Sequence, residues 1–297
     1  MGKAMAEAFA PAREAFEEVD DALSQRLSRL MWEGPESELI LTENAQPAIM
    51  AASMAIIRVL QSQAGLDLAR HARVVAGHSL GEYTALCAAG AFTLSDTARL
   101  VRLRGLAMQA ASPLGVGSMA ALIGIDVEGA EAAVAEAADA GIVVVANDNT
   151  PGQIVISGEK AAVDKAGEIA KTKGAKRVIP LSVSTANHSP LLIPAGERMR
   201  DALAEVTIRP PSVPVVTNVT AAEIAEPDTI RRLLAEQVTS RVRWRESVAA
   251  FAALGVAMTV EVGGNKVLTG MVKRIDKALE TMTIDSPADI EAFAKTL

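Results

Sequence analysis

The spacing of apolar positions predicts a chain that alternates between helices and strands. Apolar residues recur at helical spacing from Lys3 to Leu23 and from Pro47 to Ala64, and a short apolar run typical of a strand follows from Arg73 to Ala76. A third helical pattern covers Ser95 to Ala111, and the serine, proline and glycine residues just after it are typical of a boundary or hinge. The first hundred residues therefore read as large, mostly helical elements around a buried strand.

A more compact pattern occupies the middle of the chain, where strands and helices follow in the order βαββαβ. The predicted strands are Met119 to Ile125, Ile142 to Ala146, Gln153 to Ser157 and Lys176 to Leu181, and the predicted helices are Glu128 to Asp139 and Glu159 to Lys173. This order is typical of a ferredoxin-like unit. We therefore predict a small domain over residues 117–183, inserted into a discontinuous large domain of residues 1–116 and 184–297.

Larger elements return after the predicted insert. The predicted helices are Leu192 to Glu205, Asp228 to Gln237, Ser247 to Leu254 and one beginning near Lys266, and the predicted strands are Val213 to Asn218 and Ala257 to Val262. Strands that alternate with helices favour a parallel sheet covered on both faces. The sequence therefore predicts an α/β fold with an α/β-hydrolase-like large domain.

Composition and charge limit the classes of function. The chain has 297 residues, of which 50% are hydrophobic, and this is enough to bury a substantial core. A net charge of -7 and an aromatic content of 3% argue against nucleic-acid binding. Cys87 is the single cysteine, which fits a reducing compartment, and no apolar stretch is long enough to span a bilayer. We therefore expect a cytoplasmic protein with no nucleic-acid or membrane partner.

A candidate nucleophile stands between the first predicted strand and the next helix. The sequence from Gly77 to Glu82 reads GHSLGE, with Ser79 between two glycines. In a nucleophile elbow, such a serine lies on a tight strand-to-helix turn, and the glycines allow strand and helix to approach closely. The helix that follows directs N–H groups toward an oxyanion formed at Ser79. The pattern favours a catalytic serine, while a tight structural turn is the alternative.

A serine nucleophile needs a base, and histidine is scarce in this chain. His71 precedes the elbow strand and His78 lies inside the elbow, which leaves His188 as the candidate base, in a loop after the predicted insert. In the usual hydrolase order the histidine lies near the end of the fold, whereas more than one hundred residues follow His188. We therefore expect a Ser–His dyad oriented by a backbone or amide group, with a surface histidine as the alternative.

Three arginines lie close together in the helix that follows the elbow helix. Arg99, Arg102 and Arg104 fall within one and a half turns, so they cannot all face the same side. An arginine directed into the pocket would bind a substrate carboxylate in a bidentate manner. Solvated helix charges are the alternative.

These residues together resemble the family of malonyl-CoA:acyl carrier protein transacylases of fatty-acid synthesis and the related acyltransferase domains of polyketide synthases. The resemblance extends over about residues 2–275. It is carried by Gln46 and Pro47, Gly77 to Leu86, Arg99 to Gln109, Asn149 to Gly158, Val183 to Leu192, Gln237 to Trp244 and Glu261 to Ile275. Several motifs at consistent spacing are far more specific than the elbow alone.

The resemblance implies a reaction and a role for each site residue. Ser79 would carry the acyl group, His188 would act as base and then as acid, and the carbonyl of Gln237 would orient the imidazole. The N–H of Leu80 would stabilise the oxyanion, and Arg104, with Gln46 in the same pocket, would bind the malonyl carboxylate. The acyl group would pass from malonyl-CoA to the phosphopantetheine thiol of acyl carrier protein in a ping-pong sequence.

The resemblance also implies that the enzyme needs no metal or other cofactor, and we expect a monomer. No cluster of zinc ligands, Walker loop or dinucleotide-binding fingerprint occurs in the sequence. Coenzyme A would enter only as the thioester substrate. The arginines at positions 241, 243 and 245 around Trp244 add a hypothesis, in which they dock an acidic carrier protein, with a solvated basic edge as the alternative.

Three departures from the family pattern leave other functions open. Family members usually begin with a strand and a Gly-Gln-Gly loop that supplies a second oxyanion donor, and this segment would precede Met1. The loop before the histidine reads Thr185, Ala186, Asn187, and Arg241 stands where the family often has proline. The alternatives are a serine thioesterase or hydrolase, and a non-catalytic acyl-binding remnant without the N-terminal oxyanion loop.

Overall fold

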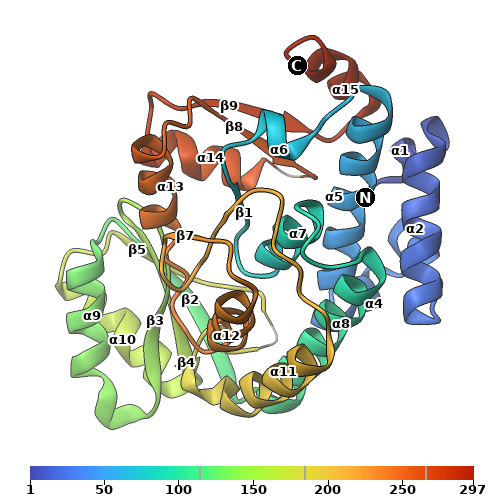
Figure 1. Ribbon diagram of the computed structural model, residues 1–297. Helices are drawn as coiled ribbons and strands as arrows, with labels where there is room; N and C mark the ends of the chain where they lie inside the picture. Colours follow the sequence, from blue (N-terminus) through green and yellow to red (C-terminus); the bar gives the residue numbers. More distant parts are fainter. Residues whose placement is uncertain (114, 184, 265) are drawn as a thin grey trace.

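The computed structural model describes residues 1–113, 115–183, 185–264 and 266–297, and Figure 1 gives the arrangement of its elements. The helices before the small sheet are α1 (Lys3–Ala8), α2 (Ala10–Leu23), α3 (Leu27–Glu33), α4 (Glu36–Leu39), α5 (Thr42–Gln63), α6 (Leu68–His71), α7 (Leu80–Ala88) and α8 (Leu94–Ala111). The later helices are α9 (Val127–Glu136), α10 (Lys160–Thr172), α11 (Ile193–Glu205), α12 (Pro227–Gln237), α13 (Trp244–Ala253), α14 (Val267–Ile275) and α15 (Pro287–Ala294). Two short 3₁₀ turns are η1 (Ala138–Ala140) and η2 (Pro190–Leu192).

The strands form three separate sheets. They are β1 (Val75–Ala76), β2 (Gly117–Ile123), β3 (Val143–Thr150), β4 (Gln153–Glu159), β5 (Arg177–Pro180), β6 (Val215–Val216), β7 (Glu223–Ile224), β8 (Met258–Val262) and β9 (Glu280–Ile284). The sheet that carries the elbow has the order β1-β6-β7, the small sheet has the order β3-β4-β2-β5, and β8 pairs with β9. The elbow strand therefore lies in a sheet of very short strands and contacts α7, which in turn packs against α5 and α8 (Figure 1).

The α/β class is confirmed, and the order of elements in the small sheet is the predicted βαββαβ. The prediction of a parallel sheet needs a correction. β1 pairs parallel to β6 and β8 pairs parallel to β9, but β7 runs antiparallel to β6. β7 follows β6 closely enough for a tight connection, which joins antiparallel strands and cannot join parallel ones. The domain boundaries stay a prediction, and Ser184, the predicted start of the second large-domain segment, lies outside the described residues.

Several element boundaries also differ from the sequence-based expectation. The predicted helix from Lys3 to Leu23 is two helices, since Phe9 is extended (φ -131°, ψ 125°) and Pro11 lies in the first turn of α2. Proline cannot donate the backbone hydrogen bond that a continuous helix would need there. α5 begins at Thr42 rather than at Pro47, so Gln46 lies inside a helix.

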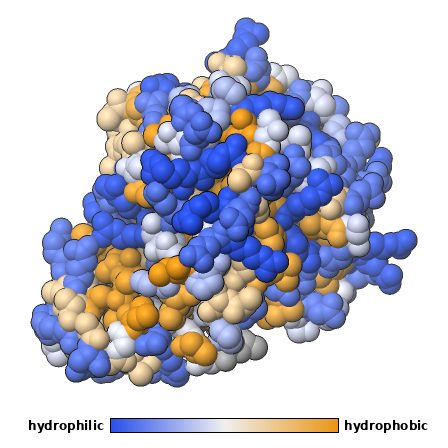
Figure 2. Space-filling view, turned by 60° about the horizontal axis from the view of Figure 1, so that its bottom comes forward, coloured by the Kyte–Doolittle hydropathy of each residue, from blue (hydrophilic) through white to orange (hydrophobic). Residues whose placement is uncertain are grey.

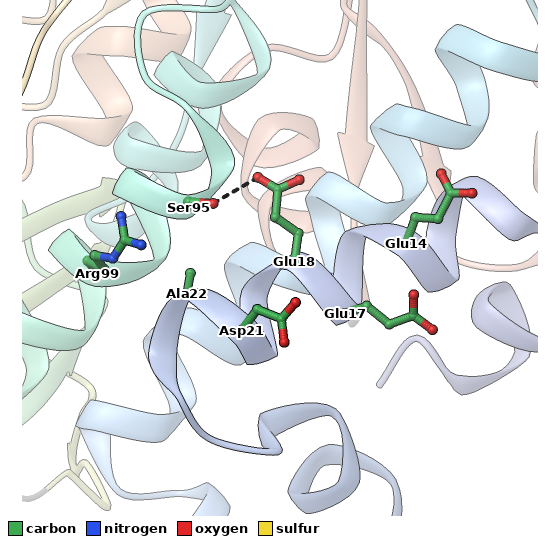
Figure 3. Close-up of a pocket in the computed structure, with 7 residues that line it drawn as sticks. All are labelled: Glu14, Glu17, Glu18, Asp21, Ala22, Ser95 and Arg99. Carbon is green, nitrogen blue, oxygen red and sulfur yellow. Dashed lines mark hydrogen bonds between the residues drawn. The ribbon is translucent and has the colours of Figure 1, made fainter.

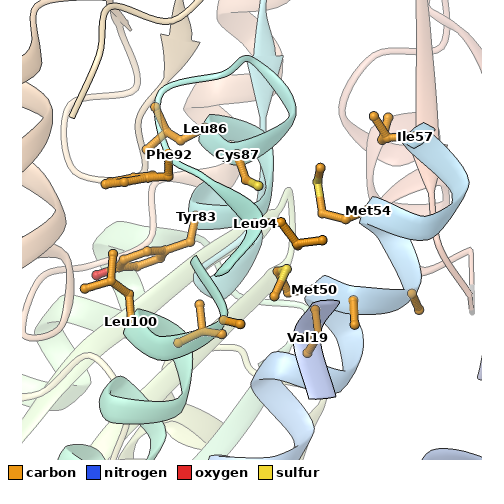
Figure 4. Packing of buried hydrophobic residues seen from close by; sticks show 14 of the residues in the cluster. Val19, Met50, Met54, Ile57, Tyr83, Leu86, Cys87, Phe92, Leu94 and Leu100 are labelled. Atoms are coloured by element: carbon orange, nitrogen blue, oxygen red, sulfur yellow. The ribbon is translucent and has the colours of Figure 1, made fainter. Parts of the chain in front are cut away.

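The main core lies between α5 and the helices α7 and α8. Figure 4 shows Met50 and Met54 on α5 facing Leu94 and Cys87, while Tyr83 and Leu100 lie on the other side of the same cluster. These side chains are almost fully buried, and each large apolar side chain buried contributes about 1.5–3 kcal/mol. This packing fixes the positions of α7, which follows Ser79, and of α8, which carries Arg104. A second cluster fills the space between the small sheet and its helices α9 and α10.

An ion pair and a strand-like bridge connect the small sheet to α13. Asn147 within β3 forms a parallel bridge with Val242, and the neighbouring Asp148 N–H donates to the Val242 carbonyl (2.9 Å). Asp148 is fully buried, and its carboxylate accepts three hydrogen bonds from Arg245 at 2.7–3.0 Å. The contact with Asp148 raises the pKa of Arg245, so this guanidinium stays charged.

Replacing Arg245 with alanine is expected to lower the free energy of unfolding by about 2 kcal/mol, because it leaves the buried Asp148 carboxylate without its partner. Arg241→Ala is the matched control, since Arg241 pairs with Glu131, which is 57% exposed, and this pair joins the same two parts of the chain. Its loss is expected to change the free energy by less than about 0.5 kcal/mol. Urea unfolding of both variants measures the difference, and equal effects would contradict the role given to Arg245.

The surface gives no independent indication of a site. Figure 2 shows hydrophilic residues over much of the upper part of one face and hydrophobic residues gathered toward its lower left. More than half of an ordinary protein surface is apolar, so this distribution assigns no binding function by itself. Among the described residues, no helix is both long enough and apolar enough to cross a membrane.

Candidate active site

Ser79 occupies a strained turn between β1 and α7. Its backbone has φ 51° and ψ -111°, which a residue with a Cβ rarely adopts. A Cβ on Gly77 would lie 2.0 Å from the backbone carbonyl of Gly81, so only glycine fits at position 77. A Cβ on Gly81 would meet nothing within 4 Å, so only Gly77 is needed for the close approach of strand and helix.

His188 lies within hydrogen-bond distance of the serine hydroxyl. Ser79 Oγ and His188 Nε2 are 2.9 Å apart, and His188 Nδ1 is 2.9 Å from the carbonyl oxygen of Gln237. A carbonyl only accepts, so Nδ1 carries the proton and Nε2 is left to accept one from Ser79. Burial and the nearby Arg104 guanidinium lower the pKa of His188 to about 3. The imidazole is therefore neutral near pH 7, as a general base must be.

Arg104 reaches the same hydroxyl from α8. The side chain is almost fully buried, and its guanidinium donates to Gln46 Oε1 (2.8 Å), Ser79 Oγ (2.9 Å) and Gln237 Oε1 (3.1 Å). It also lies over the ring of Tyr83, 5.9 Å from the centroid. Burial lowers the pKa of Arg104, but an arginine in a protein stays charged. Among the described residues no carboxylate forms an ion pair with Arg104, so a buried positive charge faces the nucleophile without one.

The two glutamines hold this guanidinium from either side. Gln46 is buried on α5, and its Nε2 donates to Thr42 Oγ1 (2.9 Å), which directs its Oε1 toward Arg104. Gln237 ends α12, and its Nε2 donates to the Ser79 carbonyl (3.0 Å) and to Glu82 Oε2 (2.9 Å). The backbone of Gln237 therefore contacts the histidine, while its side chain contacts the arginine and the elbow.

Ser79 is the residue directly before α7. Leu80 is the first residue of this helix, and no described residue accepts a hydrogen bond from its N–H. The first N–H groups of a helix have no partner within the helix, and they carry partial positive charge. The Leu80 N–H is therefore available to an oxyanion beside Ser79.

Two further residues, Glu82 and Asn218, support the elbow and were not predicted from the sequence. The Ser79 N–H donates to Asn218 Oδ1 (2.6 Å), and Asn218 Nδ2 donates to the Gly77 carbonyl (2.7 Å). The Asn218 N–H donates to Glu82 Oε2 (2.9 Å). Burial raises the pKa of Glu82 to about 7, against the hydrogen bonds from Asn218 and Gln237 and the charge of Arg104, which lower it.

His78 connects the elbow to the small sheet instead of acting at the hydroxyl. Its Nε2 lies 2.9 Å from Asn149 Oδ1 on β3, and its ring packs against Trp244 with centroids 5.6 Å apart. Burial lowers the pKa of His78, so this imidazole is also neutral. His71 is exposed on α6, where its Nδ1 accepts from the Asp67 N–H. Of the three histidines, only His188 contacts Ser79.

The neighbouring arginines differ from Arg104 in their surroundings. Arg99 pairs with Asp96 at the surface, and Arg102 donates to Gln25. The contacts at positions 241–245 also bear on the predicted docking surface. The three arginines there pair with carboxylates of this chain, which are Glu131, Glu246 and Asp148, and Trp244 is buried. Their charges are largely balanced internally, which favours the alternative of a basic edge over a carrier-docking surface.

A separate groove between α2 and α8 is lined by four carboxylates (Figure 3). Its lining residues are Glu14, Glu17, Glu18, Asp21, Ala22, Ser95 and Arg99. Glu18 accepts hydrogen bonds from Ser95 (3.0 Å) and Arg58 (2.5 Å), so this carboxylate is already engaged. None of the seven residues belongs to the Ser79 site. Among the described residues, no group of three or more histidine, cysteine, aspartate and glutamate side chains could hold a metal ion.

Comparison with known proteins gives one consistent result. The family model described as acyl transferase domain matches residues 1–285. The malonyl CoA-acyl carrier protein transacylase of Bacillus subtilis is 42% identical over 298 residues, which cover 100% of this chain and 92% of the relative. The Escherichia coli protein of the same name is 43% identical over 97% of this chain and 92% of its own.

Solved structures agree with the sequence relatives. The acyl-carrier-protein-S-malonyltransferase from Bartonella henselae is 51% identical with a TM-score of 0.97, and the match covers 100% of this chain and 94% of that one. A malonyl-transacylase in complex with its type II polyketide synthase acyl-carrier protein is 40% identical with a TM-score of 0.96, over 100% of this chain and 95% of that one.

Proposed function

The chain belongs to the acyl transferase domain family, and from this premise we propose that it transfers a malonyl group from coenzyme A to the phosphopantetheine thiol of an acyl carrier protein. The observation that carries the proposal is the joint contact of Ser79 Oγ with the neutral imidazole of His188 (2.9 Å) and the buried guanidinium of Arg104 (2.9 Å). The two contacts supply a base for the hydroxyl and a cation for an acidic acyl group.

The first half of the reaction loads the enzyme. Ser79 Oγ attacks the thioester carbonyl while its proton moves to His188 Nε2, and negative charge develops on the carbonyl oxygen. The Leu80 N–H stabilises this oxyanion, and such donors each contribute about 3 kcal/mol. When the C–S bond breaks, the departing sulfur of coenzyme A takes the proton from Nε2. The products are a malonyl ester of Ser79 and free coenzyme A.

The second half reverses the roles. His188 Nε2 accepts the proton of the carrier's phosphopantetheine thiol, and the sulfur attacks the ester carbonyl. Collapse of the intermediate releases Ser79 Oγ, which takes the proton back. Throughout, the Gln237 carbonyl holds the imidazole at Nδ1, so the same nitrogen serves as base and acid. The chemistry uses only groups of this chain, a thioester and a thiol, so we propose that it requires no cofactor.

Charge and contact explain a preference for malonyl. Its free carboxylate can form two parallel hydrogen bonds with the Arg104 guanidinium, which is held by Gln46 and Gln237. One of these bonds would replace the contact of Arg104 with Ser79 Oγ, which releases the hydroxyl for attack. An acyl group without the carboxylate would leave the cation unpaired in a buried pocket.

All of the proposed groups come from a single chain, which supports a monomer as the working unit. The single cysteine, Cys87, is buried, and burial raises the pKa of its thiol to about 11. A protein that relies on no disulfide fits the reducing cytoplasm, where we propose that it acts.

The function is tested by mixing the protein with malonyl-CoA and then with a holo acyl carrier protein. Intact-mass measurement is expected to show one malonyl adduct on the protein, and the adduct is expected to move to the carrier's thiol. Release of free malonate faster than transfer would identify a hydrolase instead. No adduct and no transfer would identify a non-catalytic protein.

Replacing Arg104 with alanine is expected to lower kcat/KM for malonyl-CoA by about 10²–10³-fold, because a buried charge pair is worth about 2–5 kcal/mol. Loading from acetyl-CoA is expected to fall far less, so the preference between the two substrates shifts. Arg104→Lys is expected to restore little, since an ammonium cannot form the bidentate contact. Arg102→Ala is the matched control, two residues away and directed at Gln25. An unchanged ratio of malonyl to acetyl loading would contradict the role of Arg104.

A further inference from the structure

Glu82 is a buried carboxylate directly behind the nucleophile, and the reaction above gives it no part. It lies on the first turn of α7 and is 1% exposed, among neighbours that are largely apolar. A carboxylate in such a place is strongly disfavoured unless hydrogen bonds compensate for lost water. Both identified donors to Glu82, the Asn218 N–H and Gln237 Nε2, converge on Oε2 at 2.9 Å.

These two partners hold the site from opposite sides. Asn218 bridges the elbow through the Ser79 N–H and the Gly77 carbonyl, and so secures the strained backbone of the nucleophile. Gln237 presents its own carbonyl to His188 Nδ1, and so sets the direction of the base. Ser79 and His188 are therefore each connected to Glu82 Oε2 through one intervening residue, Asn218 for the serine and Gln237 for the histidine.

Glu82 is also linked to the substrate-binding cation. The side-chain amide of Gln237 lies between them, since its Oε1 accepts from Arg104 and its Nε2 donates to Glu82. The charged or titratable groups acting on Glu82 are Arg104 on α8, which favours ionisation, and the adjacent Tyr83 on α7, which carries no charge near pH 7. On α5, the charge of Arg58 lowers the pKa of Cys87. Asn218, just after β6, and Gln237, at the end of α12, contact Glu82 and are neutral. The pocket of the free enzyme thus holds one cation and one carboxyl group.

Binding of malonyl would add a second carboxylate to this pocket. The guanidinium would then face two negative charges, and the new one would make the direct contact. The stabilisation that Arg104 gives to ionised Glu82 would fall, so the pKa of Glu82, already raised by burial to about 7, would rise further. A proton on Oε1 would leave Oε2 free to accept from Asn218 and Gln237 as before.

We propose that Glu82 is a positioning residue whose carboxyl group aligns the elbow and His188 through Asn218 and Gln237, and takes up one proton from solvent when the malonyl carboxylate pairs with Arg104. The proposal rests on the proposed function of the same site. The proton is consumed as malonyl binds and returned when the malonyl group leaves, so the net transfer reaction stays balanced. Discrimination between acyl groups would then depend on pH as well as on the arginine.

The first test is the pH dependence of the KM for malonyl-CoA in loading. In the wild-type protein, the KM is expected to rise as the pH rises from 7 to 9, because the negative charge of ionised Glu82 repels the malonyl carboxylate and weakens its binding. In Glu82→Gln, which keeps an oxygen to accept both hydrogen bonds, the KM is expected to stay level over the same range. Glu82→Ala removes the acceptor as well and is expected to lower kcat for loading by at least about tenfold. Glu131→Gln is the control, since Glu131 is an exposed carboxylate on α9. This variant is expected to keep the wild-type pH dependence of the KM.

A second measurement needs no variant. Calorimetry of loading at pH 7.0 in two buffers of different ionisation enthalpy is expected to show uptake of up to about half a proton per ester formed, because a carboxyl group with a pKa of about 7 is already half protonated in the free enzyme. An identical KM profile in wild type and Glu82→Gln, or no uptake of protons, would overturn the proposal. Intact mass separates this failure from failure of the proposed function, which would leave the wild-type protein without a malonyl adduct.

Discussion

Replacing Ser79 with alanine is expected to abolish the malonyl adduct and to lower transfer to the carrier by at least about 10⁴-fold. The hydroxyl is the atom that carries the acyl group, and loss of a serine nucleophile removes nearly all of the rate that its base and oxyanion donors support. The fold is expected to persist, because the elbow is held by backbone contacts of Ser79 with Asn218 and Gln237 that alanine retains.

The measurement is intact mass after incubation with malonyl-CoA, followed by a transfer assay with holo carrier protein. Ser62→Ala is the control, since Ser62 is an exposed serine on α5 whose hydroxyl donates to the Val59 carbonyl and accepts from Gln63 Nε2. An adduct of equal yield on the Ser79 variant would place the acyl group on another residue. In that case the whole account of the Ser79 site would be wrong.

The parts of this site that could be predicted from the sequence are those that depend on local pattern. The elbow is local, because Gly77 and Ser79 lie on one turn whose close packing requires glycine at a fixed offset. His188 could be predicted as the base by elimination, since the chain has three histidines and the other two lie beside the elbow. The structure brings Gln46, Arg104 and Gln237 together with them, although up to 191 residues separate these positions in the sequence.

The supporting residues could not be found in this way, because their contacts join positions far apart. Glu82 and Asn218 are 136 residues apart, and only the parallel pairing of β1 with β6 places the end of β6 beside the elbow. Two signals were present in the sequence. A carboxylate inside an apolar helix and an asparagine at the carboxyl end of a buried strand are both unusual unless a partner exists.

The secondary structure was likewise predictable where it depends on neighbouring residues, and not where it depends on residues far apart in the sequence. Amphipathic helices such as α8 were predicted to within a residue, because their apolar stripe is set by neighbours in sequence. β1 and β6 are only two residues long, and their partners are separated by more than one hundred residues. The pairing of β1 with β6 therefore joins distant positions, whereas the antiparallel addition of β7 follows from its short connection to β6.

Replacing His188 with alanine is expected to lower the rate of ester formation by about 10²–10⁴-fold, the usual contribution of a general base. His71→Ala is the matched control, because His71 is exposed on α6 and does not contact Ser79. Single-turnover loading followed by mass spectrometry measures both variants. Equal rates for the two variants would remove His188 from the proton transfer.

The wild-type pH profile gives the same residue a second, independent test. Burial lowers the pKa of His188 from 6.5 to about 3, so the imidazole of the free enzyme stays neutral as the pH falls from 7 to 5. An ordinary histidine would become protonated over this range, and kcat/KM for malonyl-CoA would fall by about 25-fold. We expect no such fall, because His188 stays neutral, and the protonation of Glu82 below pH 7 would raise kcat/KM by no more than about twofold. A fall of the ordinary size would mean that water reaches the imidazole, and that the buried dyad opens before malonyl-CoA binds.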